Sequence, residues 1–183
     1  VLLFLCCSSS TAPETQLLPP PPLESHRWPA TKSLSVVAGG DIMFGRYRGR
    51  TYIPVGGDEP FKHLKEHFHR ADLSIVNLET PITDSPAAGT SLTAQRELLF
   101  RAPSSIVSHL QDSGITVLSR ANNHAEDRYA VGVEDTTQLL NAADLLHLGV
   151  STSTDPFIPL HLTVNEVDVV LMAFTMRRNL GKP

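Results

Sequence analysis

The chain from residue 71 to residue 81 reads ADLSIVNLETP. Residues 73–76 are mostly aliphatic and β-branched, a composition that predicts a buried strand. The strand runs directly into Asn77 and Glu79, two polar residues with chemically useful side chains. In an open α/β sheet, binding and catalytic groups gather at the carboxyl ends of the strands. The stretch therefore predicts both a strand of such a sheet and one part of a functional site.

Short apolar runs on either side of this strand repeat its pattern, and helical segments separate them. We expect further strands at residues 34–38, 115–118 and 146–148, the first of them ending in a turn at Gly39-Gly40. Apolar residues recur at helical spacing between the strands: Phe61, Leu64 and Phe68 after Pro60; Ile106, Val107 and Leu110 between Pro103 and Gly114; and Val133, Leu139, Leu140 and Ala143. Strands that alternate with helices imply right-handed crossover connections and a mostly parallel sheet.

The pattern changes towards the C-terminus. Residues 160–164 and 167–174 are apolar runs that flank Asn165-Glu166, which predicts a β-hairpin with a two-residue turn. The expected fold class is therefore α/β, a layered fold with mostly parallel strands, helices between them and a β-hairpin near the C-terminus.

The first 33 residues differ in composition from the rest of the chain. Residues 1–5 are apolar and resemble the end of a truncated signal or lipoprotein-like segment, and a disordered end is the alternative. Four consecutive prolines at residues 19–22 favour an extended spacer. We expect a globular domain over residues 34–183, exported to the cell surface or the extracellular space, with a possible membrane tether through the N-terminal segment.

Composition excludes several classes of protein. The 183 residues carry 15 Lys+Arg and 19 Asp+Glu, a formal net charge of −4, which argues against a nucleic-acid partner. No apolar run approaches the roughly 20 residues that a membrane-spanning helix needs. The two cysteines are adjacent, at Cys6 and Cys7, and cannot form a disulfide framework or a four-ligand zinc site.

Polar residues follow three of the predicted strands. Asp41 follows the first, Asn77 and Glu79 follow the second, and an Asn-Asn-His sequence at residues 122–124 follows the third. Asp and Asn are also common turn residues, so each cluster alone is weak. Three clusters at three successive strand ends favour a shared site instead, and their oxygen and imidazole groups suit Mn, Fe or Zn.

Three sequence motifs resemble those of the CapA/PgsA family, which is associated with poly-γ-glutamate capsule biosynthesis and falls in the calcineurin-like metallophosphoesterase superfamily. The motifs are GDIMFGR at residues 40–46, ADLSIVNLETP at 71–81 and ANNH at 121–124. Supporting matches are Phe100-Arg101-Ala102, Asp127 and Asp135-Thr136. The resemblance covers residues 35–175 and implies an incomplete metallophosphoesterase fold.

The resemblance also implies roles for individual residues. Asp41 would ligate one of two divalent metal ions, and Glu79 would bridge both, with Asn77 beside it. Asn123 would ligate the second ion, and His124 would contact a phosphate or protonate a leaving group. Two such ions can hold a hydroxide and clamp a phosphoryl group. Arg46 would assist in binding an anionic substrate, although a solvated surface is the commoner role for such an arginine.

The chain departs from the superfamily pattern at two points. Met43 stands where a metal-binding histidine is usual, and a thioether is a poor ligand for hard ions. The downstream histidine motifs are missing, since no histidine follows His161. We therefore expect a C-terminally truncated domain that is inactive as it stands, and exposed sheet edges that make it prone to aggregate.

Two other patterns do not indicate sites. Residues 40–45 have the glycine spacing of a phosphate-binding loop, but Arg46 and Tyr47 replace the required Lys and Ser/Thr. His63 and His67 are four residues apart, without a third ligand nearby.

Three functional hypotheses remain. The first is a metal-dependent hydrolase of phosphate esters, an enzyme only if its site is complete. The second is a non-catalytic cell-envelope protein that binds, tethers or helps export an anionic polymer such as poly-γ-glutamate. The third is a relic fragment that does not fold alone.

Overall fold

The structure is a computed structural model that describes residues 33–44, 59–85, 99–150 and 158–176. All of these residues belong to one compact unit, Thr31–Pro183. The predictions for the N-terminal segment, and for Arg46 as a substrate-binding residue, lie outside the described residues. Within the described ranges, no helix is both long enough and apolar enough to cross a membrane.

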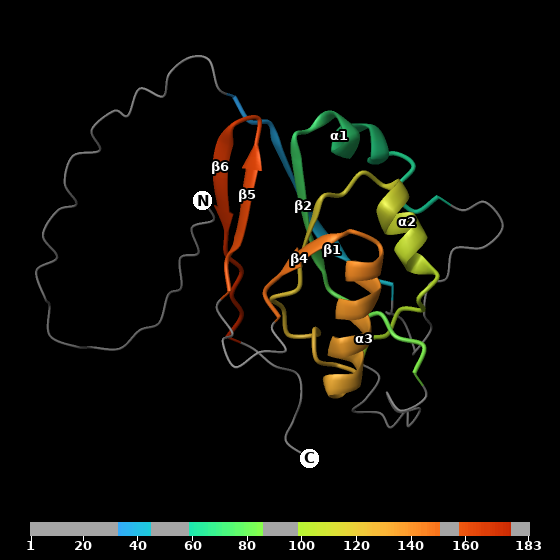
Figure 1. Ribbon diagram of the computed structural model, residues 1–183. Helices are drawn as coiled ribbons and strands as arrows, with labels where there is room; N and C mark the ends of the chain where they lie inside the picture. Colours follow the sequence, from blue (N-terminus) through green and yellow to red (C-terminus); the bar gives the residue numbers. More distant parts are fainter. Residues whose placement is uncertain (1–32, 45–58, 86–98, 151–157, 177–183) are drawn as a thin grey trace, which may run out of the picture. The chain divides into compact units, whose positions relative to one another are not determined.

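Four parallel strands form the central sheet, as the sequence predicts. They are β1 (Val36–Ile42), β2 (Leu73–Leu78), β3 (Val117–Ser119) and β4 (Leu146–Leu148). Their spatial order follows their order in the chain, β1-β2-β3-β4 (Figure 1). Each crossover therefore steps in the same direction, which places the connecting helices on the same face of the sheet.

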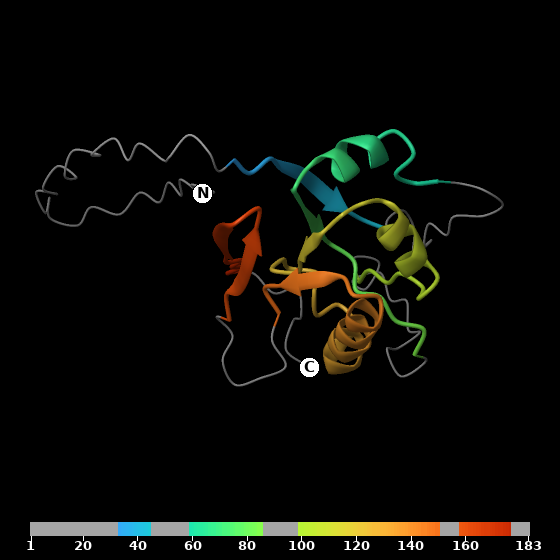
Figure 2. The same ribbon diagram turned by 45° about the horizontal axis from the view of Figure 1, so that its top comes forward.

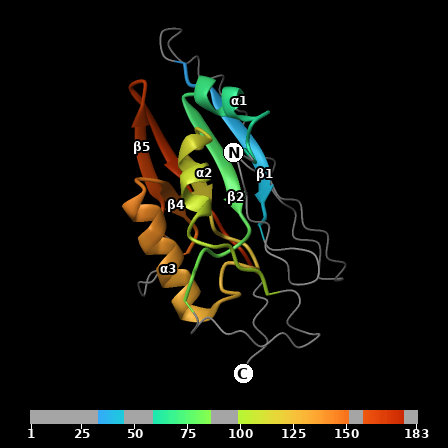
Figure 3. The same cartoon turned by 90° about the vertical axis from the view of Figure 1, so that its right-hand side faces the viewer.

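Three helices connect the strands: α1 (Lys65–Arg70), α2 (Ile106–Asp112) and α3 (Tyr129–Ala142). Each contributes a buried side chain to the main core: Phe68 from α1, Leu110 from α2 and Leu140 from α3. Alternate strand residues, among them Val76 and Leu118, pack against them. Figure 3 views the molecule from the side of these helices.

A β-hairpin covers the opposite face. Its strands β5 (Leu160–Val164) and β6 (Val167–Leu171) pair antiparallel and pack against a second core of Leu73, Val117 and Leu148. Figures 1 and 2 show the hairpin and the helices on opposite sides of the sheet. The predicted turn residues Asn165 and Glu166 have φ angles of 50° and 60°, the left-handed values that a type I′ turn requires.

The prediction of a turn at Gly39-Gly40 is wrong, because β1 continues through both glycines to Ile42. The register shifts at this point: Ala38 pairs with Ile75, but Asp41 pairs with Asn77. Two residues of β1 thus stand opposite one residue of β2, which is a β-bulge. Gly39 is required there, since a Cβ atom would lie 2.8 Å from Cγ1 of Val76.

The bulge decides which residues share a face at the carboxyl end of the sheet. Without it, Asp41 would pair with Leu78, whose side chain belongs to the core under the helices. With it, Asp41 pairs with Asn77, which in turn pairs with Ser119 on β3. Side chains of paired residues point to the same face, so the bulge brings a carboxylate beside an amide.

Candidate functional site

Hydrogen bonds join the first two predicted clusters directly. The Asn77 side-chain nitrogen, Nδ2, donates to Asp41 Oδ1 at 2.8 Å and to Glu79 Oε2 at 2.6 Å. Asp41 is exposed, whereas Glu79 is only 9% exposed. Two carboxylates from neighbouring strand ends therefore approach the same nitrogen atom, one of them open to solvent.

Asn122 links the third cluster to the other two. Its Nδ2 donates to Asn77 Oδ1 at 3.0 Å and to the Leu78 carbonyl oxygen at 2.9 Å. Its Oδ1 accepts the backbone N–H of His124 at 2.9 Å. This last bond closes an Asx turn, the local conformation that Asn favours, and the turn directs the chain out of β3 towards α3.

His124 is held from two sides. Its Nδ1 lies 2.7 Å from Oδ2 of Asp127, a carboxylate that is fully buried and also accepts the backbone N–H of Phe100. The Phe100 ring stacks on the imidazole, with centroids 4.0 Å apart and planes at 27°. Because a carboxylate accepts hydrogen bonds, Nδ1 of the neutral ring carries the proton and Nε2 is an acceptor.

The other ring nitrogen of His124, Nε2, faces Glu79. Nε2 lies 3.7 Å from Glu79 Oε1, and both side chains are largely buried. We call Asp41, Asn77, Glu79, Asn122 and His124 the polar cluster. It combines two carboxylates, two amides and one oriented imidazole at the carboxyl edge of the sheet, a set of groups that can bind a cation and move a proton.

The donor chemistry of the polar cluster fits a divalent cation. Hard and borderline ions prefer carboxylate, amide and imidazole ligands. Asp41 and Glu79 supply carboxylates, and His124 supplies an imidazole. As they stand, the described residues hold no group of three or more His, Cys, Asp or Glu arranged around a common ion position. The Asn77 amide nitrogen, and not an open coordination position, lies between the two carboxylates.

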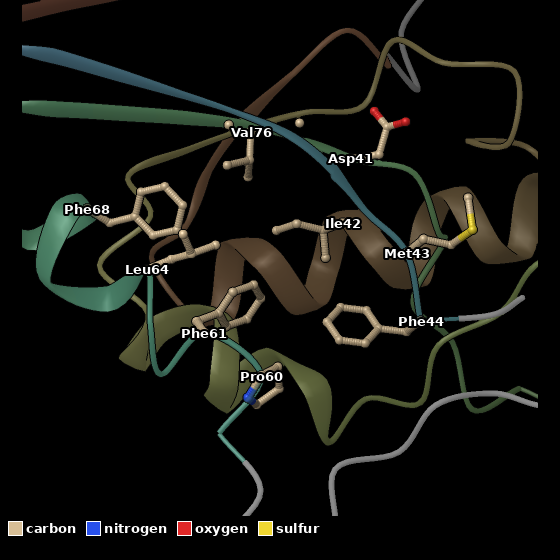
Figure 4. A pocket seen from close by; sticks show the side chains of 11 residues that line it. Asp41, Ile42, Met43, Phe44, Pro60, Phe61, Leu64, Phe68 and Val76 are labelled. Atoms are coloured by element: carbon tan, nitrogen blue, oxygen red, sulfur yellow. The ribbon is translucent and has the colours of Figure 1, made fainter.

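An apolar pocket of about 350 Å³ adjoins Asp41. Met43 lines it together with Phe44, Phe61 and Phe68. Phe44 and Phe61 meet edge to face, with ring centroids 6.4 Å apart. Figure 4 shows these rings on the side of β1 opposite to the Asp41 carboxylate, so the strand separates the rings from the polar cluster.

The structure brings Asp41, Asn77, Glu79 and His124 together, as the strand-end argument predicts. Asn123, the remaining predicted ligand, is half-buried in the turn that precedes His124. Sequence reasoning gave no role to Asn122 or Asp127, although both belong to the network. Asp127 could have been found from its position three residues after His124, a spacing at which its carboxylate can reach the imidazole.

Comparison with known proteins identifies relatives of the chain. The family described as "Bacterial capsule synthesis protein PGA_cap" matches residues 35–182. "Capsule biosynthesis protein CapA" of Bacillus anthracis is 29% identical over 145 residues, which cover 79% of this chain and 35% of the relative. "PGA biosynthesis protein CapA" of Bacillus subtilis (strain 168) is 31% identical over 144 residues, which cover 78% and 37%. The chain thus spans about a third of the length of these relatives.

Proposed function

The chain belongs to the PGA_cap family of bacterial capsule synthesis proteins. We propose that its polar cluster is a divalent-cation site of phosphoesterase type that serves capsule biosynthesis. Family membership agrees with the resemblance seen in the three motifs. The names of the Bacillus relatives associate them with capsule biosynthesis, which is consistent with a location at the cell envelope. Our proposal concerns the metal that the polar cluster binds, the reaction and the substrate.

One observation carries the proposal: carboxylates from two strand ends converge on a single atom. Asp41 Oδ1 and Glu79 Oε2 both lie within 2.8 Å of Asn77 Nδ2. Like charges at such short range destabilise each other unless positive charge or hydrogen-bond donors lie between them. A pair of carboxylates with one member open to solvent attracts cations, and the oxygen atoms suit Mn, Fe or Zn.

We assign the cation ligands to Asp41, Glu79 and Asn123, with Asn77 as a further amide ligand. When bound, two divalent ions would supply Lewis-acid activation of a phosphate ester and of the attacking water. In its doubly protonated form, His124 would donate the proton on Nε2 to the leaving oxygen and become neutral, while Nδ1–H stays hydrogen-bonded to Asp127.

The test measures Mn²⁺ binding and hydrolysis of an aryl phosphate by the full chain. Asp41→Ala and Glu79→Ala should each weaken Mn²⁺ binding by tenfold or more, because a carboxylate ligand is lost. His124→Ala should leave Mn²⁺ binding intact and lower any turnover by about 10²–10⁴-fold, the usual contribution of a proton-transfer residue. Glu66→Gln, an exposed carboxylate on α1, is the matched control and should change neither.

Two results would overturn the proposal. One is the absence of Mn²⁺ binding that depends on Asp41 and Glu79, and the other is turnover that survives His124→Ala. Binding of poly-γ-glutamate that persists in all three variants, without Mn²⁺, would favour the alternative of a non-catalytic envelope protein that tethers or helps export an anionic polymer.

A further inference from the structure

We propose that Asn122 is a positioning residue that holds the Asn77 amide between Asp41 and Glu79, so that a cation enters only after Asn77 turns away. The positioning itself rests on the hydrogen bonds of these side chains. Its consequence for cation entry rests on the proposed function above.

The orientation of Asn122 follows from two backbone groups whose hydrogen-bonding roles are fixed. The Leu78 carbonyl oxygen can only accept, so the atom 2.9 Å away must be the Asn122 nitrogen. The His124 backbone N–H can only donate, so the atom 2.9 Å from it must be the Asn122 oxygen. Exchanging the two ends of the amide would break both bonds.

The orientation of Asn77 then follows from that of Asn122. The Asn122 nitrogen lies 3.0 Å from the Asn77 side chain and needs an acceptor, which is Asn77 Oδ1. The Asn77 nitrogen is thereby directed to Asp41 and Glu79, two carboxylates that accept hydrogen bonds. The chain of contacts from the Leu78 and His124 backbone to the carboxylates has a single consistent arrangement.

This arrangement closes the position between the carboxylates. The partly positive NH₂ group of Asn77 separates two negative groups and repels an entering cation. A half turn of the amide would present its oxygen to the cation as a ligand. That turn would also set the Asn77 NH₂ group against the NH₂ group of Asn122, donor against donor. Cation binding must therefore break the bond between Asn122 and Asn77.

Removing the Asn122 amide should free Asn77 and make cation binding easier. A single hydrogen bond typically shifts an equilibrium by about 3- to 10-fold. Asn122→Ala should therefore tighten Zn²⁺ binding by about that factor, measured by calorimetry on the full chain. Ser119→Ala, which alters the neighbour of Asn77 in the next strand, is the control and should change the affinity by less than twofold.

A second readout follows the amide itself, in the absence of metal. In the ¹⁵N NMR spectrum, the Asn77 NH₂ protons should give a well-dispersed, slowly exchanging pair in the wild-type chain. Asn122→Ala should bring the chemical shifts of these two protons closer together and speed their exchange with water. If Asn122→Ala does not fold, Asn122→Asp serves in its place, because it retains an acceptor for the His124 N–H. Asn122→Asp should turn the Asn77 NH₂ group away from Asp41.

The outcomes separate this inference from the proposed function. An Asn77 NH₂ signal that is unchanged in both Asn122 variants would overturn the positioning role. Weaker Zn²⁺ binding by Asn122→Ala would overturn the closure of the site. A wild-type chain that binds neither Mn²⁺ nor Zn²⁺, but whose Asn77 signal responds to Asn122, would refute the proposed cation site and support the positioning role.

Discussion

His147 should make the stability of the fold depend on pH. It lies on β4, where its Nε2 is 3.1 Å from Asn141 Oδ1 and its Nδ1 is buried without a hydrogen-bond partner among the described residues. Burial, reinforced by the guanidinium of Arg120, lowers the pKa of His147 from 6.5 to about 4. The unfolded chain therefore binds more protons than the folded one between these pH values, and stability falls as the pH drops from 6.5 towards 4.

The size of the effect follows from the same shift. For a fully buried group, it would correspond to about 3 kcal/mol of stability lost over this range. His147 keeps part of its surface in water, which screens the charge, so we expect about 1–2 kcal/mol. His147→Gln retains a side-chain donor for Asn141 and removes the titrating group.

The assay is urea unfolding at pH 7.5 and pH 4.5. The wild-type chain should lose about 1–2 kcal/mol more on acidification than His147→Gln does. His161→Gln, which alters an exposed histidine on β5, should behave as the wild type. Equal losses in wild type and His147→Gln would show that His147 is not the source of the pH dependence.

Three further predictions concern the core, the bulge and the exposed apolar surface. Leu118→Ala removes a fully buried side chain and should lower the free energy of unfolding by about 2–5 kcal/mol, whereas Val36→Ala, at a half-exposed site, should cost less than about 1 kcal/mol. Gly39→Ala should cost about 1–3 kcal/mol because its methyl group meets β2, whereas Gly40→Ala, with no atom within 4 Å, should be neutral within about 0.5 kcal/mol; equal effects would argue against the bulge. Met172→Lys interrupts exposed apolar surface beside the hairpin and should raise the solubility limit without shifting the urea midpoint, and unchanged solubility would contradict this.

Local pattern was enough to predict the elements of the fold. Residues 146–148 form β4 as expected, and the hairpin strands begin and turn where the Asn165-Glu166 pair predicts. These elements follow from side-chain periodicity and turn chemistry, which act over a few residues and are visible in sequence. The same reasoning placed Asp41, Asn77, Glu79 and His124 at one edge, since parallel strands bring their carboxyl ends together.

What the sequence could not determine depends on pairing between distant segments. The Gly39-Gly40 pair is typical of a turn, and only the position of Val76 on the next strand makes it a bulge that sets Asp41 beside Asn77. The direction of the Asn77 amide depends on Asn122, which is 45 residues away in the chain. Local sequence predicts which groups reach the edge of the sheet, but register and hydrogen bonds across strands decide which atom of each group faces its neighbour.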